Sequence, residues 1–206
     1  MNNLNVKGSI KKAIIILVIF LLFITLLKSF QSVPTGYVGI KTRFGKVSDD
    51  VIQEGLNFKI PYIEKIVLMD CRTQKSEVDS STASKDLQEV SLNVAVNYNV
   101  NRDTSYELYR QVGINYESII ISPAILESVK SITAQYTAEE LITKRAEVSN
   151  KMEETLKEKI EARGFNVVDF NITDLDFSAA YNQAIEKNKL LNNKQNKLNM
   201  NYKNQK

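Results

Sequence analysis

An uninterrupted apolar run near the N-terminus constrains this chain of 206 residues more than any other feature. Lys7, Lys11 and Lys12 precede the uncharged residues 13–27 (AIIILVIFLLFITLL), and Lys28 closes the run. No polar face interrupts it, which disfavours a buried helix of a globular core. The run is shorter than the roughly 20 residues that a helix needs to cross the hydrocarbon core. The pattern therefore indicates either a short membrane anchor or a cleaved signal peptide.

A retained anchor is the favoured interpretation of this run. The residues that follow it, 28–32 (KSFQS), offer no small-x-small cleavage pattern, and flanking lysines can reach the membrane interface from a short span. We expect an anchor at residues 1–32 with its transmembrane part at about 13–30. Its lipid-facing residues include Ala13, Ile16, Phe20, Phe23 and Leu27. The lysines ahead of the run favour a single-pass protein of the cell membrane with a cytoplasmic N-terminus.

The amino-acid composition excludes most kinds of catalytic and metal site that a small domain could contain. The chain has no histidine, so Ser-His-Asp and Cys-His nucleophile pairs, histidine-ligated metal or haem sites and histidine pH switches are excluded. Its single cysteine excludes an intramolecular disulfide and a thiolate metal cluster. A net charge of +3 lacks the strongly basic balance of a nucleic-acid-binding domain. We expect no cofactor, metal, nucleic acid or small-molecule substrate.

Beyond Pro34 the hydrophobic period becomes that of β-strands. Residues 37–47 (YVGIKTRFGKV) are typical of a hairpin, and segments 56–60 and 66–73 are also extended. The polar stretch 76–84 (SEVDSSTAS) is typical of a loop or hairpin tip. Residues 90–100 alternate apolar and polar side chains, which predicts a strand with one buried and one solvated face.

Helix signals follow in the middle of the chain. Asp103 is a candidate cap for a short helix that Gly113 stops, and Ser122-Pro123 resembles an N-cap with proline at the first helical position. Thr137 and Glu140 have capping-box spacing. The amphipathic stretch that they begin ends at Gly164 and carries a single apolar stripe, Val148, Met152, Leu156 and Ile160.

The C-terminal part predicts one more strand and a helix. In residues 165–177, Val168, Phe170 and Ile172 share one phase, and a bulge near 173–174 brings Leu175 and Phe177 into the other. A helix follows and grades into disorder from Glu186, where asparagine and lysine dominate. These elements predict an α+β fold with a mostly antiparallel sheet and packed helices at 33–180, and a short polar helical tail at 181–206.

Two groups of polar residues are candidate sites. Asp169, Asp174 and Asp176 could hold a cation or act as acid and base, but alternation makes a solvated strand face the better interpretation. Ser84 and Lys85 are the residue types of a membrane-anchored Ser/Lys peptidase, which needs no histidine. Neighbours in an extended chain point to opposite faces, so this pair does not easily form a dyad.

Several strings resemble, in order, the SPFH or Band 7 family (stomatin, prohibitin, flotillin and HflK/C), within it the prohibitin-like branch. They are 38–47 (VGIKTRFGKV), 54–61 (EGLNFKIP, with Asn57 where histidine is usual), 84–88 (SKDLQ), 135–141 (QYTAEEL) followed by Arg145, and 172–177 (ITDLDF). The positions that carry the resemblance are Gly39, Phe44, Gly45, Gly55, Pro61, Ser84, Lys85, Asp86, Leu87, Gln88, Asp176 and Phe177.

The resemblance implies a membrane-tethered scaffold without a catalytic centre. Family members have one N-terminal membrane segment, an SPFH domain lying against the bilayer and a long coiled coil. They assemble into rings or cages that enclose membrane patches, and several restrain a membrane-bound AAA protease. We therefore expect the bilayer, further copies of the chain and such a protease as partners.

The C-terminal tail departs from the family pattern. The family continues from 184–187 (AIEK) into a long coiled coil, whereas here only about twenty residues follow. Ala184, Leu191 and Leu198 are spaced at heptads, but Lys187 and Lys194 lie near the seam. We expect side-by-side packing of domains at the membrane through the charged helix 137–163 and the start of the terminal helix, rather than a long-tailed cage.

Overall fold

The computed structural model describes residues 3–203, which form two compact units. Unit 1 comprises residues 3–72 and 100–115, and unit 2 comprises residues 73–99 and 116–203. Helices and antiparallel strands occur in both units. This architecture confirms the predicted α+β class.

Helix α1 (Asn3–Leu27) contains the apolar run. Its segment Ile10–Leu27 has a mean hydropathy of 2.7 and is not buried by any other part of the chain, so by length and composition it is able to cross a membrane. The helix ends three residues earlier than the predicted boundary at residue 30. The Ser29 amide donates back to the Leu26 carbonyl, and Phe30 already begins a strand.

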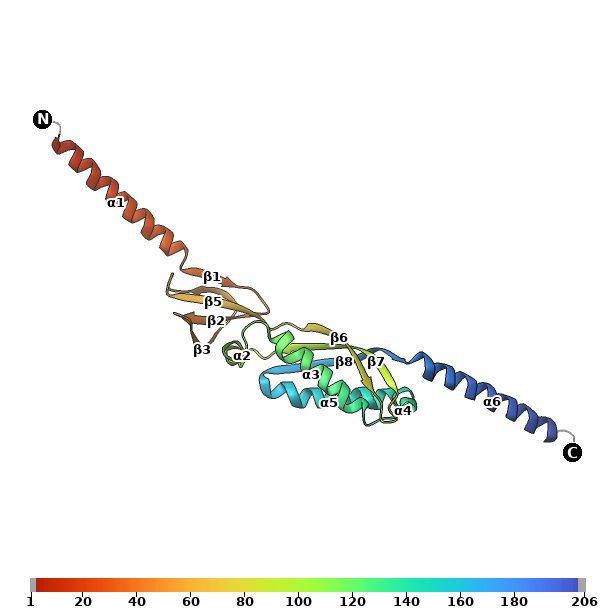
Figure 1. Ribbon diagram of the computed structural model, residues 1–206. Helices are drawn as coiled ribbons and strands as arrows, with labels where there is room; N and C mark the ends of the chain where they lie inside the picture. Colours follow the sequence, from red (N-terminus) through yellow and green to blue (C-terminus); the bar gives the residue numbers. More distant parts are fainter. Residues whose placement is uncertain (1–2, 204–206) are drawn as a thin grey trace. The chain divides into compact units, whose positions relative to one another are not determined.

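Unit 1 contains two small antiparallel sheets (Figure 1). In one, β1 (Phe30–Val33) pairs with β4 (Gly55–Phe58). In the other, β2 (Tyr37–Arg43) lies between β3 (Lys46–Ile52) and β5 (Glu64–Asp70). The core of this unit is largely aliphatic and includes Val33, Val38, Ile40, Ile66 and Met69.

The predicted hairpin at 37–47 is confirmed, with its turn at Phe44 and Gly45. Gly45 has φ +83°, a left-handed conformation that glycine adopts without steric cost. Helix α2 (Ser105–Gln111) packs against β3. The predicted cap Asp103 is wrong, because the residue that precedes α2 is Thr104 and it makes no side-chain cap hydrogen bond.

The sheet of unit 2 has the order β6 (Gln74–Ala83), β7 (Glu89–Val100), β8 (Phe165–Phe177). The strand predicted at 90–100 is confirmed. The loop predicted at 76–84 is wrong, because β6 pairs with β7 in unbroken register from Gln74 to Ala83. Its buried positions, Ser76 and Ser80, are small and polar, so the alternation carries no hydrophobic signal.

Strand β8 closes the sheet on the other side of β7. The Asn166 amide donates to the Asn99 side chain and the Thr173 hydroxyl donates to the Asn93 carbonyl, so the two strands run antiparallel. The predicted phase change near 173–174 is present. A second interruption of the alternation was not predicted: residues 168 and 169 are both exposed. Val168 is therefore 52% exposed instead of inward-facing.

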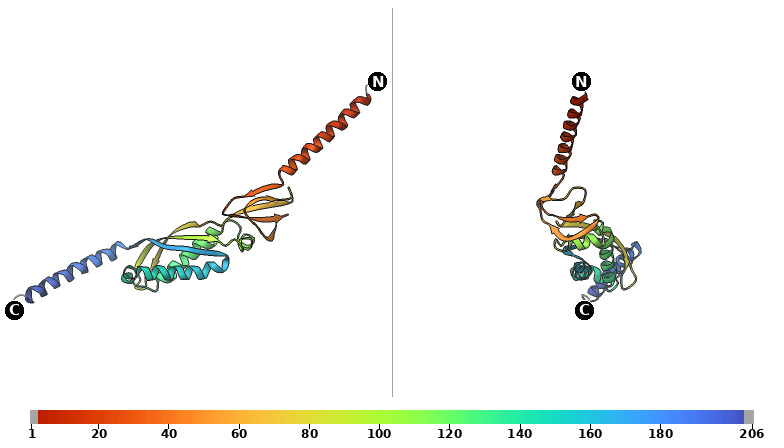
Figure 2. Two further views of the ribbon diagram at one scale, coloured as in Figure 1. Left: turned by 180° about the vertical axis from the view of Figure 1, so that it is seen from behind. Right: turned by 90° about the vertical axis from the view of Figure 1, so that its left-hand side faces the viewer.

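Helices cover one face of this sheet. Helix α3 (Ser122–Thr133) packs on β6, α5 (Arg145–Ile160) packs on β8, and the two helices pack on each other (Figures 1 and 2). The predicted apolar stripe of α5 is confirmed, since all four of its side chains are fully buried. Ser122 is not an N-cap, because the π-helix η1 (Glu117–Ile121) continues directly into α3.

The helical stretch between α3 and β8 is divided into α4, α5 and a final 3₁₀ turn. The predicted capping box is confirmed at the start of α4 (Ala138–Thr143), where Thr137 and Glu140 bond reciprocally. Lys144 separates α4 from α5, and the 3₁₀ turn η2 (Glu161–Arg163) ends at Gly164.

The terminal segment forms one helix, α6 (Ala179–Lys203), which is longer than predicted. The expected disorder from Glu186 is wrong for the described residues up to 203. No glycine or proline interrupts this segment, so nothing in the backbone stops the helix.

Replacing Gly39 with alanine is expected to destabilise unit 1 by about 3 kcal/mol through overpacking. The added Cβ would lie 2.8 Å from Ile66 Cγ2 and 3.1 Å from Ile52 Cβ. Gly45→Ala is the control, because its Cβ would meet nothing within 4 Å and costs only about 1 kcal/mol of left-handed strain. Hydrogen exchange of the micelle-bound protein measures both, with unit 2 amides as an internal reference. Equal effects of the two variants would contradict the packing argument.

Candidate membrane-facing and subunit-contact surfaces

Unit 1 exposes large apolar side chains beside the end of α1. We define the apolar rim as Phe30, Leu56, Phe58, Ile60 and Tyr62, which are between 40% and 77% exposed. They come from β1, β4 and the loop after β4, and β1 begins within three residues of the last residue of α1. The Phe30 and Phe58 rings meet edge to face, with centroids 5.8 Å apart. A contiguous apolar surface next to an anchor is typical of a membrane-contacting face.

A buried carboxylate holds the loop of this rim in place. Glu64 is almost fully buried, and one of its oxygens accepts a hydrogen bond of 2.7 Å from Arg43. The other accepts from the Ile60 amide at 2.9 Å, while the Glu64 amide donates back to the Ile60 carbonyl at 2.9 Å. The Ile60 bond, and after it Arg43, lower the pKa of Glu64 below its ordinary value, despite the opposing effect of burial. Tyr62 is thereby held outward, at φ +67°.

The hairpin turn of β2 and β3 lies against the same loop. The Phe44 amide donates to the Ile63 carbonyl at 3.1 Å, and Phe44 is 82% exposed at φ +48°. A hollow of about 520 Å³ between the turn and the loop is lined in part by Phe44, Gly45 and Tyr62. Two aromatic side chains in left-handed conformations therefore project from neighbouring turns.

In unit 2, hydrogen bonds tie the β6–β7 connection to the start of α4. The Ser84 hydroxyl donates to Asp86 Oδ1 at 2.6 Å and accepts from the Gln88 amide at 3.0 Å. Asp86 Oδ1 also accepts from the Ala138 amide at 3.0 Å, and the Lys85 amide donates to the Tyr136 carbonyl at 2.8 Å. The Ser84 bond, with the help of Ala138, lowers the pKa of Asp86.

These bonds show the role of the Ser84 hydroxyl, the candidate nucleophile of a Ser/Lys pair. Ser84 is 3% exposed, and its hydroxyl proton is donated to a carboxylate. The hydroxyl therefore closes the turn, which is a structural role and not the arrangement of a nucleophile facing an amine. Leu87 lies at the tip of this connection, 85% exposed at φ +60°.

The sequence block 172–177 lies at the same end of unit 2 as the blocks 84–88 and 135–141. Arg145 Nη2 donates to the Ile172 carbonyl at 2.7 Å, which joins the start of α5 to β8. The Asn182 side-chain amide donates to the Phe177 carbonyl at 3.2 Å, which joins α6 to β8. The Phe177 and Tyr181 rings lie 5.2 Å apart.

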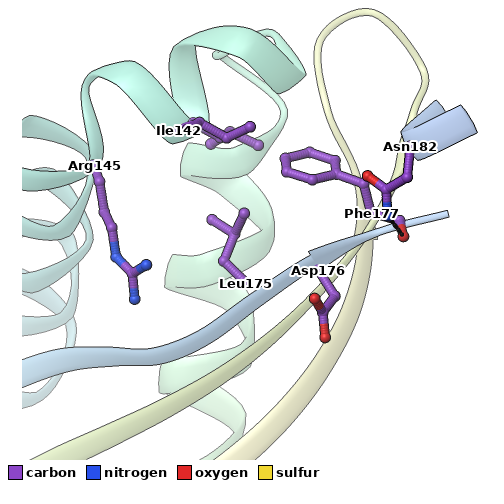
Figure 3. Close-up of a pocket in the computed structure, with 7 residues that line it drawn as sticks. Ile142, Arg145, Leu175, Asp176, Phe177 and Asn182 are labelled. Carbon is purple, nitrogen blue, oxygen red and sulfur yellow. Dashed lines mark hydrogen bonds between the residues drawn. The ribbon is translucent and has the colours of Figure 1, made fainter. Parts of the chain in front are cut away.

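An open groove of about 280 Å³ lies between these segments (Figure 3). Its lining residues are Leu141, Ile142, Arg145, Leu175, Asp176, Phe177 and Asn182. Ile142, Leu175 and Phe177 form its apolar part, with Arg145 on one side and Asp176 and Asn182 on the other (Figure 3). Ile142 is 56% exposed, so the groove presents a large aliphatic side chain to solvent.

The structure brings some predicted positions together and separates others. Asp86, Asp176 and Phe177 lie at one end of unit 2, whereas Gly39, Gly55 and Pro61 belong to unit 1. Asp169, Asp174 and Asp176 are exposed, and no metal-binding group of three or more His, Cys, Asp or Glu side chains is found among the described residues.

Sequence reasoning missed Glu64, Tyr62 and Ile142. The signal for Glu64 is its cross-strand pairing with Arg43, which needs the register of β2 and β5. Tyr62 and Ile142 are single exposed apolar residues in the sequence. They become part of a surface only through residues that are close in space.

Comparison with known proteins places most of the chain in one family. Residues 31–205 match the SPFH domain / Band 7 family. Prohibitin-1 of Schizosaccharomyces pombe is 32% identical over 169 residues, 82% of this chain and 60% of the relative. Mitochondrial prohibitin-7 of Arabidopsis thaliana is 36% identical over 77% of this chain and 58% of the relative. Prohibitin-2 of Mus musculus is 35% identical over 70% and 48%, so the chain spans about half to three fifths of these relatives.

Acid is expected to loosen the loop that Glu64 holds. Its pKa is lowered in the folded state, so its contribution to stability is present above the ordinary value of 4.5 and is lost as the pH falls through the lower folded value. Glu64→Gln should speed exchange of the β5 amides roughly tenfold at neutral pH, because a charge-assisted hydrogen bond is lost. The variant should also lose the acid sensitivity that the parent shows. A parent and variant with the same pH profile would contradict this role.

Ser84→Ala is expected to destabilise the β6–β7 connection by about 1–2 kcal/mol, because the Gln88 amide loses an acceptor. The measurement is amide exchange at 84–88 and 138–141. A serine-reactive fluorophosphonate should label the parent and the variant equally weakly. Labelling of the parent that disappears in Ser84→Ala would favour the peptidase alternative.

Proposed function

The chain belongs to the SPFH/Band 7 family as a prohibitin-like scaffold protein, and from this premise we propose that it homo-oligomerises at the membrane. In this proposal it organises membrane patches, regulates a membrane-bound AAA protease, or does both, without catalysis of its own. The proposed organisation is an anchor at 1–32, an SPFH domain at 33–180 and a polar helical tail at 181–206.

Membrane attachment is supported by α1 and by the apolar rim. The apolar window of α1 is long enough to cross a bilayer, and the rim offers a second contact beside it. The lysines that precede the uncharged residues 13–27 support a cytoplasmic N-terminus in the cell membrane, with the remainder on the other side.

The proposal of self-association rests on the groove of unit 2, which residues of the family blocks 135–141 and 172–177 line in part. The groove combines residues of α4, the end of β8 and the start of α6. These are the elements that a second copy would meet if the charged helices and the terminal helix form the subunit contact. Anchoring in one bilayer raises the effective concentration of the copies, so each contact needs little affinity. If the contact joins two different faces of neighbouring copies, it closes into rings when its rotation permits.

Ile142→Lys is expected to remove the higher oligomers. A charge in the apolar part of the contact should weaken association at least tenfold, which corresponds to about 1.4 kcal/mol. Ile119→Lys is the matched control, because Ile119 is 55% exposed and lies on η1, outside the groove. Amine-reactive cross-linking in membranes, followed by the mass of the detergent-extracted assembly, measures the change.

The parent and the control should give a cross-linking ladder beyond the dimer, and Ile142→Lys should give mainly monomer. A parent that is strictly monomeric both in membranes and in mild detergent would exclude a self-associating scaffold. Equal ladders for the parent and both variants would place the contact elsewhere. Co-purified proteins identified from the same extract test the protease partner.

A further inference from the structure

A basic hollow lies beside the end of α1 in unit 1. It encloses about 340 Å³, and we define it by its lining residues, Lys28, Phe30, Lys59, Pro61, Tyr62 and Glu64. The strand β1, the loop that Glu64 holds, and the residue that follows α1 each contribute to it. Its walls are aromatic and its charged groups are mainly ammonium.

The charged groups of the hollow differ in how many of their hydrogen-bonding positions are already occupied. Glu64 is ionised, but its negative charge is paired with Arg43, and its second oxygen accepts from the Ile60 amide. Lys59 Nζ donates to the Gln31 side-chain oxygen at 2.7 Å, which uses one of its three donors. Lys28 Nζ lies over the Tyr62 ring, 5.9 Å from its centroid. Ammonium donors therefore remain for an acceptor that enters the hollow.

The position of the hollow relative to the membrane follows from where α1 ends. Lys28 directly follows the apolar window of α1, which ends at Leu27. A lysine at the end of a membrane span lies at the level of the lipid headgroups, and Tyr62, whose ring lies under Lys28 Nζ, lines the same hollow. A hollow lined by both residues opens where lipid phosphates are concentrated.

We propose that this hollow binds the phosphodiester of an anionic phospholipid in the leaflet next to unit 1. A phosphate accepts hydrogen bonds from several ammonium groups, and these bonds are charge-assisted. Phosphatidylcholine carries the same phosphate, but its own cation would lie against Lys28 and Lys59. Phosphatidylglycerol lacks that cation, so the hollow selects the anionic lipid. This inference rests on the proposed contact of unit 1 with the membrane.

The absence of tryptophan from the chain permits a direct test. Tyr62→Trp places a single reporter at the hollow, and Phe58→Trp places one on the apolar rim outside it. The full chain is reconstituted in phosphatidylcholine vesicles that contain the same small fraction of brominated phosphatidylglycerol or brominated phosphatidylcholine. Bromine near the headgroup end of the acyl chains quenches a neighbouring indole.

We expect brominated phosphatidylglycerol to quench Trp fluorescence in Tyr62→Trp about threefold more than brominated phosphatidylcholine, as lysines at an anionic interface would produce. The two lipids should quench Phe58→Trp equally. Adding Lys28→Gln and Lys59→Gln to Tyr62→Trp should remove the preference. Lys189→Gln with Lys194→Gln, on the exposed surface of α6, should leave it unchanged.

The outcomes separate the two proposals. If neither reporter is quenched, unit 1 does not contact the bilayer, and the membrane-facing role fails together with the lipid site. If both reporters are quenched equally by both lipids, the membrane contact stands and the lipid site is overturned. Loss of the preference on addition of millimolar inorganic phosphate at constant ionic strength would assign the hollow to a free anion instead.

Discussion

The short connection between α1 and β1 is the constraint on which the rest of unit 1 depends. The helix ends at Leu27 and the first strand begins at Phe30, so only two residues separate a membrane-length apolar helix from a folded sheet. That distance leaves little freedom for β1, for its partner β4, or for the side chains that they expose. A buried carboxylate, Glu64, then sets the following loop, and the exposed aromatic residues beside it become part of the same surface.

Unit 2 obtains its proposed contact surface from polar bonds between segments that are distant in sequence. Asp86 accepts from the Ala138 amide, and Arg145 donates to the Ile172 carbonyl. The Ala138 amide lies at the start of α4, where the first amides of a helix have no partner within the helix. The family motifs at 84–88, 135–141 and 172–177 thus meet at one end of the unit, and residues of the last two line the groove there.

The sequence predicted those elements whose signals are local. Alternation at 90–100 and the capping box at Thr137 depend on residues that are neighbours in the chain, and both are confirmed. The strand β6 could not be predicted, because buried Ser76 and Ser80 give it no hydrophobic period, and only pairing with β7 makes it a strand. The Glu64 network, the groove and the basic hollow depend on register and on the meeting of distant segments, which periodicity does not encode.

The chain has no histidine, and the ionisable groups that support these surfaces keep their charge near neutral pH. The pKa values of Glu64 and Asp86 are lowered, so both carboxylates are ionised throughout the neutral range. Hydrogen bonds to Glu140 and Tyr136 raise the pKa values of Lys144 and Lys151, which stay cationic over the same range. These four charges therefore do not change near pH 7. In the proposed scaffold, which has no histidine, these four side chains therefore provide no pH switch near neutrality.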